Sequence, residues 1–214
     1  ELSDSADFDL GSGDFTIEFF VYTNSTSRQT LFSQTNSGGT DATTSFYTEI
    51  NSSAQWRFVV VSTDTTAYEI VAGTAIRDKW THLAYVRDGN TATLYVDGIS
   101  IGTDDLTGVT VKNSGQVVSI GRYPGGLNFS GFISNLRLVK GTAVYTSNFT
   151  PPTSPLTNVT NTKLLCCQSV DDDKDNMGGL YASSSIHTTK ADVLANGTLL
   201  TAGQGISNQY LYLV

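Results

Sequence analysis

The sequence predicts an all-β fold, and three observations lead to that prediction. Ser, Thr, Gly and Asn together supply 86 of the 214 residues, whereas Glu, a common residue of helix surfaces, occurs only four times. Thr and the aromatic residues favour strands, and Gly, Asn, Asp and Ser favour turns. Short apolar runs with a period of two recur at regular intervals, with turn residues between them. We therefore expect many short strands in a sandwich or a barrel.

Composition and charge disfavour several classes of protein. Hydrophobic residues make up 39% of the chain, which is enough for a core and unlike a disordered segment. A net charge of −8 disfavours nucleic acid and anionic membranes as partners. No apolar run approaches the roughly 20 residues that a membrane-spanning helix needs. The chain begins at Glu1 without Met, which we interpret as a segment or a processed product.

The first predicted strand, at residues 14–22, shows the pattern most clearly. One face of it is apolar and is expected in the core: Phe15, Ile17, Phe19 and Val21. The other face carries Thr16, Glu18, Phe20 and Tyr22. This is the alternation of a strand with one buried face. Ten further strands are predicted at 30–33, 45–51, 55–62, 66–72, 80–87, 92–97, 116–121, 131–139, 163–168 and 208–214.

Turn residues indicate two hairpins in the middle of the chain. Asp88-Gly89-Asn90 separates the runs at 80–87 and 92–97. Asp97-Gly98 then leads into a third short apolar run that begins at Ile99. Asp-Gly and similar pairs favour the tight turns that join antiparallel strands.

Two stretches interrupt the strand pattern. Residues 149–155 hold three of the four prolines, so we expect an extended segment that crosses an edge of the sandwich. Residues 171–190 are expected to form a long loop with an Asp-rich start. We divide the chain into a sandwich at 1–169 and an extension at 170–214, in which the Asp-rich loop precedes a last strand. That strand would close the sandwich or pair with a neighbour.

The two cysteines are adjacent in the sequence. A bridge between Cys166 and Cys167 would be strained. We expect two reduced thiols on a strand, one pointing inward and one outward.

Four ordered motifs within residues 8–140 resemble the laminin-G-like jelly-roll domains of the concanavalin A-like lectin/glucanase superfamily. The motifs are Asp14-Phe15-Thr16-Ile17-Glu18-Phe19, Trp80-Thr81-His82-Leu83-Ala84, Leu94-Tyr95-Val96-Asp97-Gly98, and Ser119-Ile120-Gly121 followed by Phe129-Ser130-Gly131-Phe132-Ile133-Ser134-Asn135. The resemblance implies a jelly-roll sandwich of two antiparallel sheets. Ser134-Asn135 departs from the family, which often has an acidic pair at this place.

A narrower resemblance covers residues 136–168. This stretch is similar to the version of the domain found in structural proteins of marine tailed phages, notably cyanophages. The resemblance implies a non-enzymatic virion surface protein, either a capsid decoration or a fibre component, that binds host-surface glycans. Its partners would be other virion proteins or copies of itself, and its place the surface of the particle.

The glucanases in the superfamily make an enzyme the first alternative to test. Retaining glycosidases need two carboxylates about 5 Å apart, and glucanase relatives carry them on one strand as Glu-x-Asp-x-x-Glu. None of the four glutamates has this spacing. His82 and His187 stand alone and form no metal motif. We therefore expect no enzyme, with Glu18 as a solvated or hydrogen-bonded strand residue and His82 as a satisfied strand histidine.

No cofactor is expected to be required, and calcium is the one metal that the sequence suggests. Asp171, Asp173 and Asp175 alternate as hard oxygen ligands of the kind that calcium prefers. An ordinary solvated turn is the alternative interpretation of this loop.

Glycan binding needs an aromatic ring for the C–H groups of a sugar and polar side chains for its hydroxyls. The loop 122–129 offers Arg122, Tyr123, Asn128 and Phe129, and we take these four as the candidate glycan site. Packing of the two rings on the rim of the sandwich is the alternative. A second candidate combines Tyr47 with Arg57 and the neighbouring Trp56, which is also a candidate core residue.

Two other functions stay open. One is a carbohydrate-binding adhesion module of a bacterial cell-surface or secreted protein. The other is a coat or filament subunit without a ligand, in which the extension pairs with a neighbour.

Overall fold

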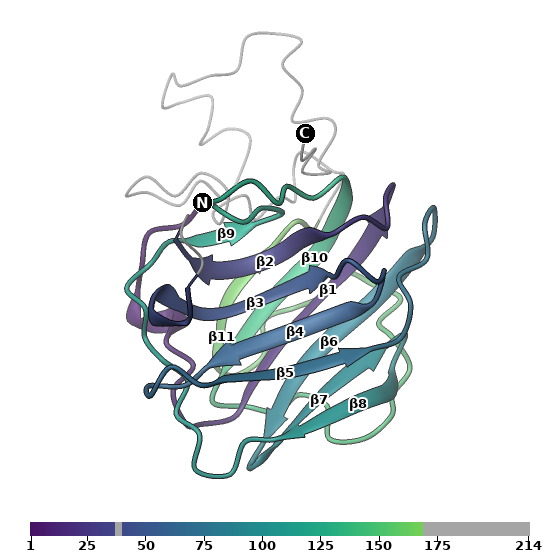
Figure 1. Ribbon diagram of the computed structural model, residues 1–214. Coiled ribbons are helices and arrows are strands. Elements are labelled where there is room, and N and C mark those ends of the chain that lie inside the picture. Colours follow the sequence, from purple (N-terminus) through teal and green to yellow (C-terminus); the bar gives the residue numbers. More distant parts are fainter. Residues whose placement is uncertain (37–39, 169–214) are drawn as a thin grey trace, which may run out of the picture.

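The computed structural model describes residues 1–36 and 40–168. Two antiparallel sheets face one another and enclose the core (Figure 1). Six strands in the order β11-β10-β1-β6-β7-β8 form one sheet, and five in the order β5-β4-β3-β2-β9 form the other. The elements are η1 (Ala6–Phe8), β1 (Phe15–Thr23), β2 (Gln29–Thr35), η2 (Asp41–Thr43), β3 (Thr44–Ile50), β4 (Trp56–Val61), β5 (Ala67–Ala72), β6 (Trp80–Asp88), β7 (Thr91–Val96), β8 (Ile99–Asp105), β9 (Val118–Ile120), β10 (Gly131–Lys140) and β11 (Thr162–Cys166).

The all-β jelly-roll sandwich predicted from the sequence is confirmed. The predicted strands between residues 14 and 168 form, and both Gly-containing hairpins connect β6, β7 and β8 as expected. The short run at Ile99 extends further than predicted, to Asp105. The predicted strand at 208–214 and the Asp-rich loop lie outside the described residues.

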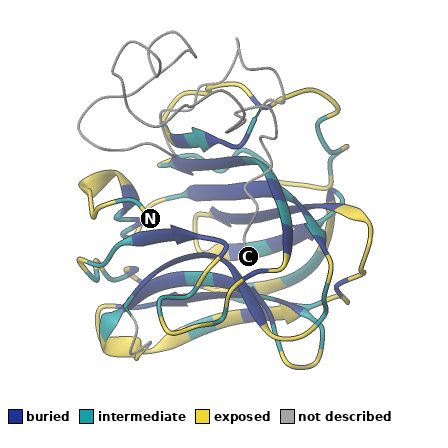
Figure 2. Ribbon diagram, turned by 90° about the horizontal axis from the view of Figure 1, so that it is seen from above, coloured by how far each residue is buried: buried dark blue, intermediate teal, exposed yellow. Residues whose placement is uncertain are grey.

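The core lies between the sheets and is built from the predicted apolar face of β1 and its counterparts. Phe15, Ile17 and Phe19 are buried there, and the ring of Phe58 from the opposite sheet packs edge-on against Phe15 at 6.1 Å between centroids. Burial follows the strands, while the connections between them are mostly exposed (Figure 2). The sequence allowed Trp56 to be either a core residue or part of the second glycan candidate, and the structure places it in the core.

The prediction that the proline-rich stretch crosses an edge of the sandwich is wrong. Residues 141–161, here called the crossing segment, lie on the outer face of the six-stranded sheet. Val144 N–H donates to Thr16 Oγ1 of β1 at 2.9 Å, and Phe149 N–H donates to the Gly98 carbonyl at the β7–β8 turn at 2.9 Å. The reason is a second apolar patch on that face, where Tyr95 is buried and Phe149 packs on it.

The cysteine pair also differs from its prediction. Both thiols are reduced and buried, with their Sγ atoms 3.7 Å apart. Cys167 follows the end of β11 and has φ = 59°, in the left-handed region. This turn breaks the strand alternation, so the second side chain does not point outward.

Candidate functional site

The predicted glycan loop, residues 122–129, lies across the end of β2 and is anchored to that strand. The Ser33 hydroxyl donates to the Arg122 carbonyl at 3.0 Å, and Thr30 N–H donates to the Leu127 carbonyl at 3.1 Å. These bonds fix the loop on the rim of the five-stranded sheet.

The loop presents three of its four predicted residues to solvent and buries the fourth. Arg122 and Asn128 are exposed, Tyr123 is half-buried, and Phe129 is only 1% exposed. The prediction for Phe129 is therefore wrong, because its backbone N–H bonds the Gly121 carbonyl at 2.8 Å and the ring enters the core. A buried ring cannot stack on a sugar.

Tyr123 meets a residue of the second sequence candidate. Its ring stands edge-to-face on the ring of Tyr47 in β3, with centroids 6.3 Å apart and planes at 88°. The guanidinium of Arg57 in β4 lies 5.4 Å from the centroid of the Tyr47 ring. Such ring pairs and cation–π contacts each stabilise an arrangement by about 0.5–1.5 kcal/mol.

A network of ion pairs holds Arg57 in that place. Glu49 is buried and accepts from Arg57 at 3.0 Å and from Arg28 at 3.0 Å. Glu69 from β5 pairs with the same guanidinium at 2.5 Å. Burial raises the pKa of Tyr47 by more than Arg57 lowers it, so the Tyr47 hydroxyl stays protonated at neutral pH and can donate a hydrogen bond.

Together these residues form the first candidate site, which we call the tyrosine surface: Tyr47, Arg57, Glu69, Tyr123 and the exposed residues of the loop 122–128. It combines two aromatic rings with fixed hydrogen-bond donors and acceptors. The guanidinium of Arg122 in this loop pairs with Glu1 at 3.2 Å and not with the Glu49–Arg57–Glu69 network.

The opposite sheet buries a charged cluster under the crossing segment. Glu18 on β1 and His82 on β6 are both fully buried, with Glu18 Oε2 3.2 Å from His82 Nε2. Glu18 Oε1 accepts from Arg137 of β10 at 2.9 and 2.5 Å, and Tyr145 of the crossing segment donates to Oε2 at 2.8 Å. Every oxygen of this carboxylate is thus occupied by protein groups. Glu18 is thus hydrogen-bonded, which is one of the two roles that the sequence left open, and His82 bonds it through Nε2.

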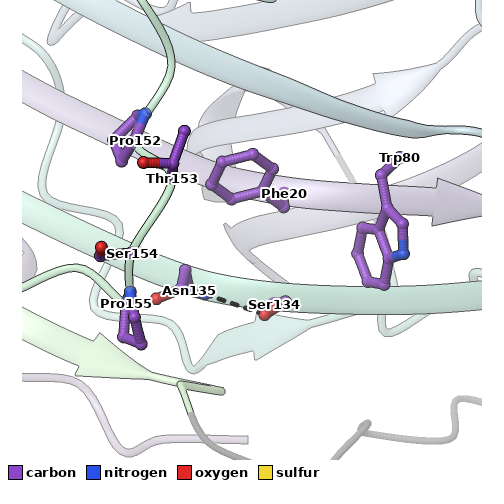
Figure 3. A pocket seen from close by; sticks show the side chains of 8 residues that line it. All are labelled: Phe20, Trp80, Ser134, Asn135, Pro152, Thr153, Ser154 and Pro155. Carbon is purple, nitrogen blue, oxygen red and sulfur yellow. Dashed lines mark hydrogen bonds between the residues drawn. The ribbon is translucent and has the colours of Figure 1, made fainter.

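Beside the buried cluster, the same face of the sheet and the crossing segment enclose a pocket of about 300 Å³, here called the Trp80 pocket (Figure 3). Phe20 lies at its centre, with Trp80 on one side and Pro152 and Thr153 of the crossing segment on the other. The full lining is Phe20, Trp80, Ser134, Asn135, Pro152, Thr153, Ser154 and Pro155.

Sequence reasoning missed this pocket, although one signal for it was present. Phe20 and Tyr22 are aromatic residues on the face of β1 that the alternation assigned to the outside. Two large aromatic rings on the outer, partly polar face of a strand are typical of a binding surface. What the sequence could not show is that the crossing segment folds back to supply the second wall.

Metal and membrane features are limited in the described part of the chain. No group of three His, Cys, Asp or Glu side chains converges there to hold a metal ion. The calcium candidates Asp171, Asp173 and Asp175 lie outside the described residues. Within 1–36 and 40–168, no helix is long and apolar enough to cross a membrane.

Comparison with family models decides the family. A model described as the concanavalin A-like lectin/glucanases superfamily, of the laminin G type, matches residues 2–147. The chain belongs to this superfamily. The match spans every strand of the sandwich from β1 to β10, and it confirms the resemblance inferred from the four motifs. No match was found among curated proteins.

Solved structures share the fold at low sequence identity. A presumed carbohydrate binding protein from Bacteroides ovatus superposes with a TM-score of 0.52 and 16% identity, covering 67% of this chain and 42% of that one. A sialidase CBM40 module from Ruminococcus gnavus, bound to sialyllactose, gives 0.48 and 17%, covering 63% and 78%. A pentraxin from Limulus polyphemus gives 0.47 and 21%, covering 64% and 67%. The match to the Bacteroides protein shows a shared fold alone, and the chain spans less than half of that protein.

Proposed function

We propose that the chain is a non-enzymatic carbohydrate-binding module and that the tyrosine surface is its glycan site. The observation that carries this proposal is the meeting of Tyr47 and Tyr123, from distant parts of the sequence, edge-to-face at 6.3 Å beside a fixed guanidinium. Sugars are bound by aromatic rings that contact their C–H groups and by oriented polar groups that bond their hydroxyls. Both kinds of group are present on the tyrosine surface, and the superfamily to which the chain belongs includes lectins.

The carboxylates support a binding role over hydrolysis. Glycoside hydrolysis needs one carboxyl group to donate a proton and another to attack or to activate water. Glu49 and Glu69 both pair with the same guanidinium, that of Arg57. The guanidinium of Arg57 is thus bonded to both carboxylates. Glu18 is buried and satisfied on the opposite sheet.

A glycan array tests the binding proposal. The full chain should bind a subset of glycans, and Tyr123→Ala should lower the affinity for at least one of them at least tenfold. Ile76→Ala is the matched control, because this side chain is apolar, 54% exposed and outside the tyrosine surface. Equal binding by wild type and Tyr123→Ala, with an unchanged melting temperature, would contradict the proposed site.

We further propose that the module acts on the surface of a virion, as a capsid decoration or a fibre component. The similarity of residues 136–168 to cyanophage structural proteins supports this. A bacterial surface adhesion module and a ligand-free coat subunit are the competing roles. Copurification of the chain with a particle would favour the virion, and copurification with a cell wall would favour the adhesin. An oligomer that dissociates when residues 190–214 are deleted would favour the coat subunit.

Calcium binding at Asp171, Asp173 and Asp175 stays a prediction of the sequence. Millimolar calcium should raise the melting temperature, and a chelator should reverse the rise. An unchanged melting curve would contradict calcium binding and would not bear on the proposed glycan site.

A further inference from the structure

We propose that the Trp80 pocket is a second carbohydrate site and that it takes an uncharged pyranose residue. It lies on the outer face of the six-stranded sheet, whereas the tyrosine surface lies on the five-stranded sheet. The two sites share no residue, so the proposal does not depend on the tyrosine surface.

The floor of the pocket continues into a row of aromatic rings on three adjacent strands. Tyr22 of β1 lies between Trp80 of β6 and Phe132 of β10, with centroid distances of 5.7 and 5.9 Å. Trp80 keeps 38% of its surface exposed. These three rings belong neither to the core between the sheets nor to the buried patch around Tyr95. Trp80 therefore presents exposed ring surface to the apolar face of a sugar.

The polar groups of the pocket are oriented by the backbone around them. Asn135 Nδ2 donates to the Ser134 hydroxyl at 3.0 Å, and Asn135 Oδ1 accepts from Leu156 N–H at 2.8 Å. These bonds fix which end of the amide is the donor and leave one Nδ2 hydrogen and one Oδ1 lone pair for a ligand. Thr153 and Ser154 add two exposed hydroxyls on the facing wall.

The lack of charged side chains in the lining of the pocket favours a neutral sugar over an acidic one. None of the eight side chains that line the pocket is charged. The nearest buried cation in the described cluster, Arg137, already pairs with Glu18 and donates to the Thr157 carbonyl at 2.7 Å. A uronic or sialic acid would lose hydration here without gaining an opposite charge, whereas a neutral hexose loses only hydroxyl hydration that Asn135 and the two hydroxyls restore.

The second wall is held in place before any ligand arrives. Pro152 and Pro155 restrict the backbone of the crossing segment. Leu156 N–H donates to Asn135 Oδ1 and Arg137 donates to the Thr157 carbonyl, and these two bonds tie the following residues of the segment to β10. A preformed wall lowers the entropy lost on binding, and a volume of about 300 Å³ is at the small end of ligand pockets, which suits about one sugar residue.

Tryptophan fluorescence can test this site separately from the tyrosine surface. The chain has two tryptophans, and Trp56 is only 1% exposed, so quenching by the uncharged quencher acrylamide reports mainly on Trp80. The probes are maltotriose, cellotriose, mannotriose and chitotriose, with trigalacturonic acid as the acidic comparison. At least one neutral probe should protect Trp80 from acrylamide, and trigalacturonic acid should not.

Variants then assign the protection to the pocket. By calorimetry, Trp80→Ala and Asn135→Ala should each weaken the neutral probe at least tenfold. Tyr123→Ala and the exposed-face control Ile99→Ala should leave its affinity within twofold. Melting curves check that each variant is folded. No protection by any neutral probe, stronger protection by the acidic trimer, or loss of neutral binding in Tyr123→Ala would each overturn this proposal. The first two results leave the tyrosine surface standing.

Discussion

Glu18 shows, at the scale of a residue, how a carboxylate on the outward face of a strand becomes part of the protein interior. The crossing segment covers it, and its partners come from β6, β10 and that segment. Burial alone would raise the pKa of Glu18, but the hydrogen bond with His82, the charge and hydrogen bonds of Arg137 and the bond from Tyr145 together lower it. The ionised form is thus the one that the fold stabilises.

Replacing this carboxylate should be costly. Glu18→Gln leaves the buried Arg137 guanidinium without its counter-charge, and loss of one partner of a buried ion pair costs about 3–5 kcal/mol. We expect the free energy of unfolding, measured with urea, to fall by about that amount. Glu69→Gln is the matched control because its side chain is half exposed, and it should change stability by under about 1 kcal/mol. A loss below about 1 kcal/mol in Glu18→Gln would contradict the buried pair.

The same residue predicts an acid sensitivity. The folded-state pKa of Glu18 lies below its ordinary value of 4.5, so its contribution is complete above that value and is lost as pH falls through the folded-state pKa. Urea unfolding of wild type and Glu18→Gln should therefore give stabilities that differ most near pH 7, and the difference should shrink as pH falls below 4.5. A difference that stays constant from pH 7 to pH 3 would assign the stabilisation to packing instead of charge.

Single residues also show which side-chain orientations the local sequence can predict and which it cannot. The alternation correctly put Phe20 and Tyr22 on the outer face, since it depends only on neighbours along one strand. It could not tell Tyr123 from Phe129, because both are aromatic residues in a Gly- and Pro-containing loop. Which ring turns inward depends on the bond from Phe129 N–H to the Gly121 carbonyl and on space in a core built by distant strands.

At the scale of the element, the crossing segment links the fold to the proposed second site. It has no regular secondary structure, yet its backbone bonds the six-stranded sheet at several points. Proline content predicted an extended path but not its route. The route follows from Tyr145 and Phe149, which stack at 3.6 Å over a buried patch of that sheet, and such long-range contacts are invisible in a local pattern.

Gly98 offers a direct test of how this segment docks. It has φ = 77°, and a Cβ there would lie 1.9 Å from the Phe149 carbonyl oxygen. Gly98→Ala should destabilise the protein and displace the segment. Gly108→Ala is the matched control, because Gly108 has φ = 74° and a Cβ there would have no neighbouring atom within 4 Å.

Both variants carry the same left-handed penalty of about 1 kcal/mol, so their difference isolates the contact. We expect Gly98→Ala to cost at least about 1 kcal/mol more than Gly108→Ala in urea unfolding, as a backbone clash must be relieved. Equal losses would mean that the crossing segment does not dock at the β7–β8 turn.

At the scale of the whole molecule, the sandwich separates two surfaces of different chemistry. The tyrosine surface carries fixed ion pairs beside two rings, and the Trp80 pocket carries rings and neutral polar groups. The strands and the core were predictable because period-two patterns and turn residues repeat along the chain. The surfaces were predictable only in part, since each combines side chains from strands far apart in sequence.

The central claim is that this fold binds carbohydrate at the tyrosine surface. The most direct measurement is an NMR titration of the labelled chain with the strongest ligand from the glycan array, following backbone amide shifts. If carbohydrate binds at the tyrosine surface, saturable shifts will cluster on Tyr47, Arg57 and the loop 122–128. Shifts that cluster elsewhere, the Trp80 pocket included, or no saturable shifts with any array ligand, would contradict this claim.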